Sequence, residues 1–326
     1  MADIARHLQL STSTVSRALS RHPSIPEKTR LRVEKTASAL GYRPDPMMSQ
    51  IAARRWSRTS AEPRACMAYI VLGAKVNRRT PHWKGAQRGA ASLGYRLEGF
   101  SVENMDASNH LCRILRARGI RGIIFRHATA SARLPDWDWS AYSVICCGEP
   151  PAEHPPMHTV ELAITDNHQR LARECLARGI KRPGLLFAAT PWLRSEHRRL
   201  GGLTTPFLEA GLAPPPFRWW NEESATEISK WLTKVKADAV ITMLVPQALK
   251  LRDANIIGQK GLPYGCMQLN PDDPREIAGV CSNFSGVGEM AARLCEMSIR
   301  QNRLGLPEQP TLTQVVSDWR DGGSLG

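Results

Sequence analysis

Two short amphipathic segments near the amino-terminal end of the chain are separated by only three residues. Both segments, MADIARHL and TSTVSRAL, carry apolar side chains at helical spacing, and these are Ile4, Ala5 and Leu8 in the first and Val15, Ala18 and Leu19 in the second. Ser11 stands where an N-cap is needed for the second segment. Two helices joined by so short a connection are typical of a helix-turn-helix.

A third helix is predicted between residues 24 and 41. Ser24 and Glu27 have the spacing of a capping box, and Gly41 is suited to end the helix. Its apolar positions are Val33, Ala37 and Leu40. The three helices together can enclose one small shared core.

The front of the second helix is rich in hydroxyl side chains. With its apolar stripe turned inward, the positions left outside are Thr12, Ser13, Ser16 and Arg17. The second helix of a helix-turn-helix enters the major groove by its N-terminal end, where short hydroxyls approach phosphates or base edges and an arginine can bridge guanine O6 and N7. The sequence therefore predicts a DNA-reading surface on this helix.

Charge is concentrated in the same region. Residues 1–60 hold eleven basic and four acidic side chains, so half of the net charge of +14 lies in less than a fifth of the chain. A concentrated basic end favours a polyanionic partner, because neutralised phosphates release condensed counterions. Charge alone also allows a merely solvated, solubilising face.

The segment YRPDPMMSQIAARRW begins with two prolines and continues as a helix-compatible run from about Asp45 to Arg55. A segment of about ten residues is too short to remain helical alone in water. We expect it to become helical against DNA or against a second copy of the chain.

These motifs resemble the headpiece of the LacI/GalR family of bacterial transcriptional regulators. DIARHLQLSTSTVSRALS is similar to the family pattern DVAxxAGVSxxTVSRVLN, and VEKTASALGYRPDPMMSQIAA to its third helix, turn and hinge helix. The resemblance implies a repressor that binds a pseudo-palindromic operator as a homodimer. The implied DNA-binding residues are Thr12, Ser13, Ser16, Arg17, Tyr42, Ile51, Ala52 and Arg54.

One hinge position departs from the family. Ile51 occupies the place of a leucine that family members insert into a central minor-groove step. A β-branched side chain is stiffer, so we expect a shallower kink or a preference for another base step.

From residue 65 onward, strand-like and helix-like segments alternate. The predicted strands are CMAYIVLG, YRLEGF, GIIFRH, YSVICCG, HTVELA, GLLFAA, FRWWN, DAVITML, YGCMQLN and IAGVCSN. Helical runs lie between most of them, including HWKGAQRGAASLG, NHLCRILRARG, TDNHQRLARECLARG, SEHRRLGGLTTPFLEAG and ATEISKWLTKVK. Such alternation predicts an α/β fold of doubly wound parallel sheets, and about ten strands favour two lobes with a ligand cleft beyond the carboxyl ends of the strands.

The resemblance to the family extends to this region as a periplasmic-binding-protein-like (type I) core. It implies a headpiece over residues 1–57, with the hinge helix at about 45–55, and an effector-binding and dimerisation core over 58–326. Within the core it implies a first lobe of about 62–160 plus 284–311 and a second of about 161–283 plus 312–326, with crossings near 161, 283 and 312.

Five residues are predicted to bind a small-molecule effector because they lie at predicted strand ends or in the loops that follow. They are Asn77, Arg126, His127, Trp192 and Arg199, the last at the position of the family arginine that holds ligand polar groups. The paired acids that hold sugar hydroxyls in many relatives are absent from TML and GCMQLN. A basic and aromatic set suits an anionic or aromatic ligand, although surface arginines and a packed Trp192 would explain the same pattern.

Other function classes find little support. No His-Glu-x-x-His, Gly-x-Ser-x-Gly or phosphate-loop pattern occurs, so no catalytic residue, metal or cofactor is predicted. No apolar run approaches the about 18 residues of a membrane span. Eight cysteines without Cys-x-x-Cys spacing and an amino terminus unlike a secretion signal favour the cytoplasm, at the nucleoid.

Two alternatives to a regulator remain open, a small-ligand-binding protein of the same core fold and an α/β enzyme. The sequence leaves undetermined the operator, the effector, the sign of regulation, and whether the protein is a dimer or a tetramer.

Overall fold

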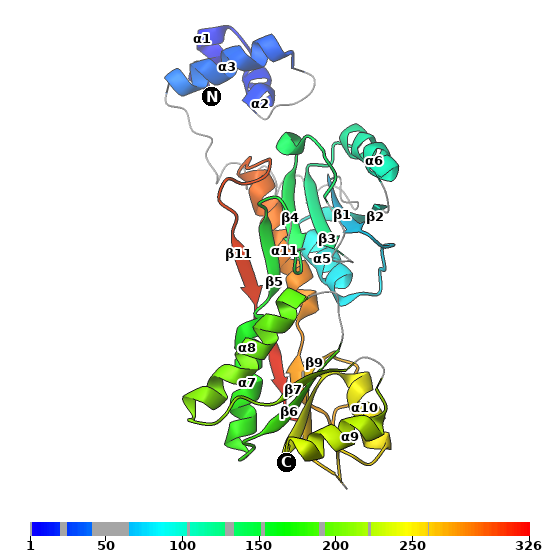
Figure 1. The fold of residues 1–326 in the computed structure, drawn as a ribbon. Helices are drawn as coiled ribbons and strands as arrows, with labels where there is room; N and C mark the ends of the chain where they lie inside the picture. The colour runs from blue at the N-terminus through cyan, green and yellow to red at the C-terminus, as the bar shows by residue number, and fades with distance from the viewer. Residues whose placement is uncertain are drawn as a thin grey trace. The chain divides into compact units, whose positions relative to one another are not determined.

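A computed structural model describes residues 2–19, 25–40, 65–102, 105–127, 134–150, 154–188, 193–220, 223–259 and 261–326 (Figure 1). The chain divides into two compact units, residues 1–62 and 63–326. We call the first the headpiece and the second the core.

The headpiece contains three helices. They are α1 Ala2–Leu8, α2 Thr12–Leu19 and α3 Glu27–Ala39. Gln9 has a φ of 54° between α1 and α2, and the N–H of Leu10 donates to the carbonyl of Ala5 at 2.9 Å, which closes the short turn. Ser11 Oγ accepts the backbone N–H of Thr14 at 3.0 Å and caps α2, as predicted.

The small core of the headpiece is formed by residues from all three helices. Its buried members are Ile4, Ala5, Val15, Ala18, Val33 and Ala37, with Leu8, Leu10, Leu19 and Ile25 partly buried around them. The prediction that Leu40 completes the apolar stripe of the third helix is wrong, because α3 ends at Ala39 and Leu40 is 50% exposed. The predicted cap Ser24 and stop Gly41 lie outside the described residues.

The first sheet of the core has the strand order β11-β5-β4-β3-β1-β2, and every pairing in it is parallel. Its strands are β1 Ala65–Leu72, β2 Tyr95–Val102, β3 Gly122–His127, β4 Ser143–Cys147, β5 His158–Leu162 and β11 Leu312–Val315. Helices α5 Pro81–Ser92 and α11 Phe284–Arg300 cover one face, and α6 Met105–Ala117 covers the other. A 3-10 helix at Trp139–Ala141 precedes β4. These elements form the first lobe.

The second sheet has the order β12-β10-β9-β8-β6-β7 and is parallel except for β12, which pairs antiparallel with β10. Its strands are β6 Pro183–Ala188, β7 Phe217–Trp220, β8 Ala239–Leu244, β9 Tyr264–Leu269, β10 Ala278–Cys281 and β12 Asp318–Arg320. Helices α7 Ile164–Ala177 and α8 Leu193–Glu209 cover one face, and α9 Ala225–Lys234 and α10 Val245–Asp253 cover the other. These elements form the second lobe, and the predicted doubly wound α/β architecture is confirmed.

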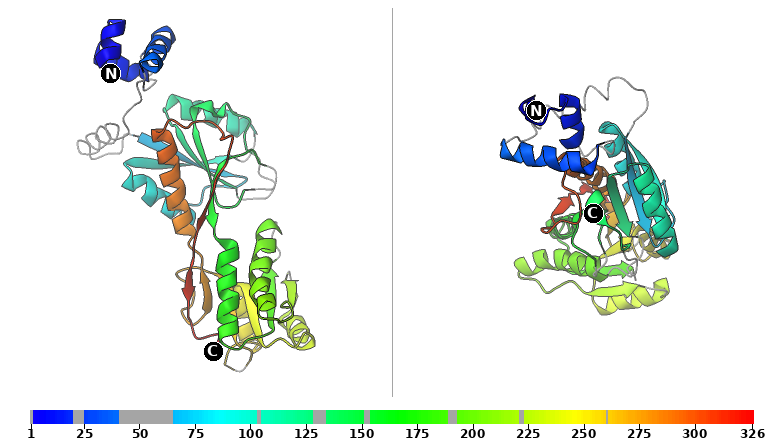
Figure 2. Two further views of the ribbon diagram at one scale, coloured as in Figure 1. Left: turned by 90° about the vertical axis from the view of Figure 1, so that its left-hand side faces the viewer. Right: turned by 90° about the horizontal axis from the view of Figure 1, so that it is seen from above.

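The chain passes between the two lobes three times, and Figure 2 shows the last passage as the red segment after α11. The crossings follow β5, β10 and β11, so Leu162 and Leu312–Val315 belong to the first sheet rather than to the second lobe expected from the sequence. One buried hydroxyl joins the three crossings. Ser317 Oγ accepts hydrogen bonds from Asn167 Nδ2 at 3.0 Å and from the backbone N–H of Asn283 at 3.3 Å.

Helices α5 and α11 approach one another backbone to backbone. A Cβ on Gly85 would lie 1.8 Å from the carbonyl oxygen of Ser285, and a Cβ on Gly288 would lie 2.0 Å from that of His82. Only glycine allows this contact, which brings the start of α11 and the start of α5 to the same end of the first sheet.

All eight cysteines lie within the described residues, and all are free thiols. Among the described helices, none has the length and apolar character needed to cross a membrane.

Candidate DNA interface and effector cavity

The outward face of α2 presents short hydroxyl side chains. Thr12 and Ser13 are exposed, while Val15 and Ala18 on the opposite side are fully buried. Ser11 Oγ also lies 2.8 Å from Ser13 Oγ, so the cap and the exposed hydroxyls form one polar end of the helix. This end carries no acidic residue in its first turn, and its free N–H groups and positive helix dipole suit a phosphate.

The remaining predicted DNA contacts are described only in part. Ser16 and Arg17 lie on α2, but their side chains are outside the described part of the structure. The other four predicted residues, Tyr42, Ile51, Ala52 and Arg54, lie outside the described residues altogether. These assignments stay predictions.

A cavity of about 260 Å³ lies between the two lobes. The first lobe contributes the carboxyl ends of β3, β4 and β5 with the starts of α5 and α11, and the second contributes α8, β8 and β9. Residues from both lobes line it, and they are His82, Arg126, His127, Gly148, Glu149, Glu161, Leu162, Ile164, Ser195, Glu196, Arg199, Met243, Gln268, Phe284 and Val287.

The structure brings three of the five predicted effector-binding residues together here. Arg126 and His127 end β3, and Arg199 lies on α8 across the cavity. Asn77 does not line the cavity; it is exposed, and its Oδ1 accepts the backbone N–H of Arg79 at 2.9 Å within the loop that leads into α5. Trp192 lies outside the described residues.

Arg126 lies beside two buried imidazoles. Its Nη1 donates to His82 Nε2 at 3.3 Å, and His127 Nδ1 lies 3.9 Å from Cys146 Sγ. Burial, together with the charge of Arg126, holds the pKa of His82 well below its usual range. Burial, then His154 and Arg126, lowers the pKa of His127 to about 4. Both rings are therefore neutral at pH 7.

Gly148 leaves the space that the arginine occupies. Its φ is +94°, and a Cβ there would lie 2.7 Å from Arg126 Nη1. A glycine after β4 thus serves both the turn and the close approach of the guanidinium.

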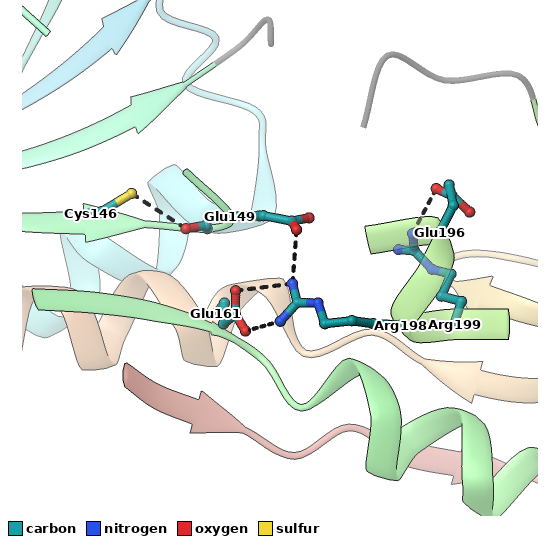
Figure 3. A network of polar contacts seen from close by, with 7 residues as sticks. Cys146, Glu149, Glu161, Glu196, Arg198 and Arg199 are labelled. Carbon is teal, nitrogen blue, oxygen red and sulfur yellow. Dashed lines mark hydrogen bonds and ion pairs between the residues drawn. The ribbon is translucent and has the colours of Figure 1, made fainter. Parts of the chain in front are cut away.

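A salt bridge joins the two lobes at the edge of this cavity (Figure 3). Arg198 on α8 binds both oxygens of Glu161 on β5 through its two terminal nitrogens, with Nη2 3.2 Å from Oε2. The same Nη2 donates to Glu149 Oε1 at 2.9 Å. We call this set of three residues the clasp; its Glu161 side chain is only 4% exposed.

Arg199, the next residue, turns toward the interior of the second lobe. Its Nη1 donates to Glu196 Oε1 at 2.9 Å and its Nη2 to Gln268 Oε1 at 3.3 Å. Burial lowers the pKa of Arg199, against the opposing effect of Glu196. The charge of Arg199 is thus balanced within the protein.

The expected basic and aromatic character of the pocket needs correction. Three carboxylates, Glu149, Glu161 and Glu196, line the cavity together with the two arginines. Among the described lining residues the aromatic hydrocarbon ring is that of Phe284, which packs on His82 with 4.7 Å between ring centroids. Glu149 lies two residues after the end of β4, so a search of the loops that follow predicted strands could have found it. Glu161 stands inside an apolar strand, where a carboxylate is itself a signal of a buried partner.

The described residues contain no group of three or more His, Cys, Asp or Glu side chains placed to hold a metal ion. His154 and His158, the histidine pair of the EHPPMH segment, instead contact Pro155 and Thr311. The cavity can therefore bind a small molecule through a guanidinium, neutral imidazoles, carboxylates and apolar side chains.

Known proteins resemble this chain in two ways, by sequence in the headpiece and by fold over almost the whole chain. The family described as bacterial regulatory proteins, lacI family, matches residues 1–45. The HTH-type transcriptional repressor CytR of Escherichia coli K12 is 46% identical over 59 residues, which are 18% of this chain and 17% of CytR. The sequence match to this curated relative thus spans about a sixth of its length.

Solved structures share the fold over almost the full length. The transcriptional regulator CelR in its complex with cellobiose has a TM-score of 0.57 at 15% identity, covering 97% of this chain and 96% of CelR. A lac repressor dimer bound to operator and the anti-inducer ONPF has a TM-score of 0.55 at 14% identity, covering 98% of both chains. Residues 1–45 thus match the lacI family of bacterial regulatory proteins, and the chain shares the fold of solved transcriptional regulators.

Proposed function

We propose that the protein is a sequence-specific transcriptional regulator, a repressor that binds a pseudo-palindromic operator as a homodimer. The observation that carries the proposal is the helix-turn-helix of residues 2–19, whose second helix is buried on its apolar side and exposes Thr12 and Ser13 on the other. The match of residues 1–45 to the lacI family supports the same assignment.

In this proposal Thr12, Ser13, Ser16 and Arg17 contact bases and phosphates in the major groove. Residues 45–55 form a hinge helix that places Ile51 and Ala52 in the minor groove, and Tyr42 and Arg54 contact the backbone. The headpiece ends near residue 57, and the protein acts in the cytoplasm on the nucleoid. Two headpieces are required because one buries too little surface to be selective, and pairing doubles the contacts.

The core is proposed to couple a small molecule to DNA binding. The cavity lies between lobes connected by three crossings, so a ligand that contacts both lobes favours one lobe arrangement over another. The solved relative CelR is in complex with cellobiose, and the lac repressor dimer is bound to operator and an anti-inducer. These complexes support a core that binds a small molecule and a headpiece that binds DNA in this protein as well.

In-vitro selection of duplex DNA by the full-length protein tests the proposal. We expect recovery of a palindrome, with specific binding at about 10⁻⁸ to 10⁻¹¹ M against 10⁻⁴ to 10⁻⁶ M for random duplex. Recovery of no motif would contradict the proposal and favour a plain ligand-binding protein of the same fold.

A pair of variants tests the role of the second helix. Arg17→Ala is expected to cost about 1–3 kcal/mol on the selected operator and much less on shuffled duplex, because a base contact is lost. The matched control, Arg32→Ala, removes the same charge from an exposed position on α3 and should affect both duplexes equally. Equal losses for Arg17→Ala on both duplexes would show that Arg17 is a phosphate contact.

A further inference from the structure

Arg126 has no carboxylate partner among the ion pairs of the described residues, although it lines a cavity and is half-buried. The other arginine of the cavity wall, Arg199, is paired with Glu196, and Arg198 at the edge is paired with Glu161 and Glu149. Arg126 instead donates to a neutral imidazole, His82. A guanidinium removed from bulk water is most stable with an anion beside it.

A buried imidazole in the wall of the same cavity also lacks a hydrogen bond. His127 is only 4% exposed, and its Nε2 has no hydrogen-bond partner in the structure. A buried polar nitrogen without a partner is costly and rare in folded proteins, which marks this wall of the cavity as one that the described residues leave incompletely paired.

The rest of the cavity limits the size and polarity of the ligand. Its apolar wall consists of Leu162, Ile164, Met243, Phe284 and Val287. A volume of about 260 Å³ is below the roughly 300–1,000 Å³ of pockets for drug-sized molecules. The ligand is therefore a compact metabolite with an apolar body.

The remaining charges limit the charge of the ligand. Glu149, Glu161 and Glu196 also line the cavity, so a second negative charge on the ligand would meet carboxylates. One anionic group fits Arg126, the cavity guanidinium that has no acidic partner among the described residues.

We propose that the cavity binds a small monocarboxylate with an apolar or aromatic body, whose carboxylate is held by Arg126 and whose body packs against Phe284. This inference rests on the proposed function in treating the cavity as the effector site. It names the chemical class of the effector and a specificity-determining residue, Arg126.

Isothermal titration calorimetry on the full-length protein tests the ligand class. The probes are benzoate, phenylacetate and hexanoate, each paired with its carboxamide, with cellobiose and inorganic phosphate for comparison. We expect saturable binding of at least one acid, with its amide weaker by roughly 10- to 100-fold because a charge-assisted hydrogen bond is lost. Equal binding of acid and amide, binding of cellobiose or phosphate alone, or no binding of any acid would each overturn the proposal.

Variants of the anchor test the residue. Arg126→Gln should lower acid affinity by a similar factor, and Arg126→Lys should restore part of it, because lysine keeps the charge but loses the two-pronged contact. Arg113→Gln, which removes a charge from the exposed surface of α6, is the matched control and should bind like wild type. Undiminished affinity in Arg126→Gln overturns the proposal, and thermal unfolding verifies that each variant is folded.

The same samples separate this inference from the proposed function. Operator selection is run both without ligand and with the acid that binds, so failure of both selections in wild type would refute the regulator proposal even if benzoate binds. Successful selection without carboxylate binding would refute only the ligand class.

Discussion

Replacing Arg198 with methionine removes the cation that joins the two lobes. Glu161, which receives two of the contacts of Arg198, has a side chain only 4% exposed, so little water reaches it once the guanidinium is gone. Breaking a buried ion pair by removing one partner costs about 3–5 kcal/mol. Because the Arg198 side chain is itself 23% exposed, we expect the lower end, about 3 kcal/mol of the free energy of unfolding of the core.

Tryptophan fluorescence during thermal unfolding measures this loss, because every described tryptophan lies in the core. A loss of about 3 kcal/mol corresponds to a fall of roughly 6–12 °C in the midpoint for a domain of this size. Arg113→Met on the exposed surface of α6 is the control and should remain within about 0.5 kcal/mol of wild type.

A double-mutant cycle isolates the pair. Arg198→Met combined with Glu161→Gln should be more stable than Arg198→Met alone by more than about 1 kcal/mol, since the buried charge is gone as well. A single-variant loss below about 1 kcal/mol, or strictly additive losses in the cycle, would refute the reasoning that Glu161 is held away from water and depends on Arg198.

Two further predictions concern a histidine and the helix contact of the first lobe. The unfolded chain binds a proton at His127 near pH 6.5, whereas the folded chain does not bind it until about pH 4. The neutral His127 therefore contributes about 3 kcal/mol to the free energy of unfolding above pH 6.5, and this stability is lost as the pH falls toward 4. The midpoint of thermal unfolding should thus fall less steeply with acid in His127→Gln than in wild type, and identical slopes would contradict the assignment. Gly288→Ala, whose Cβ would lie 2.0 Å from the carbonyl of His82, should destabilise the core by on the order of 3 kcal/mol in denaturant titration. Gly201→Ala, in a helix with nothing within 4 Å of the added Cβ, should instead raise stability by up to about 1 kcal/mol, and similar effects of the two changes would refute the close-contact argument.

Much of the fold could be predicted because its signals are local. Buried parallel strands are continuous apolar runs, and β1, β3, β4, β6 and β8 are almost entirely buried. The edge strands β11 and β12 were missed because they are short and partly exposed, so that their pairing comes from the neighbouring strand and not from their own pattern. Leu40 fits the helical period, but it lies one residue beyond the end of α3.

The residues of the cavity could be predicted only where their position at the end of a strand places them there. Arg126 and His127 were found because they end a strand. His82, Gln268 and the clasp depend on which elements of the two lobes face one another, which no local pattern contains. Asn77 also follows a strand, but its loop folds back to precede α5, where its carbonyl accepts the N–H of Thr80.

The hydroxyl of Ser317 has a mechanical consequence for the core. Because it is bonded to Asn167 and to the backbone of Asn283, none of the three connections can bend without straining the other two. These hydrogen bonds tie the three connections together where they pass between the lobes, so we expect the connections to bend together when the lobes move. A small molecule that favours one arrangement of the lobes must then favour one geometry of all three connections at once.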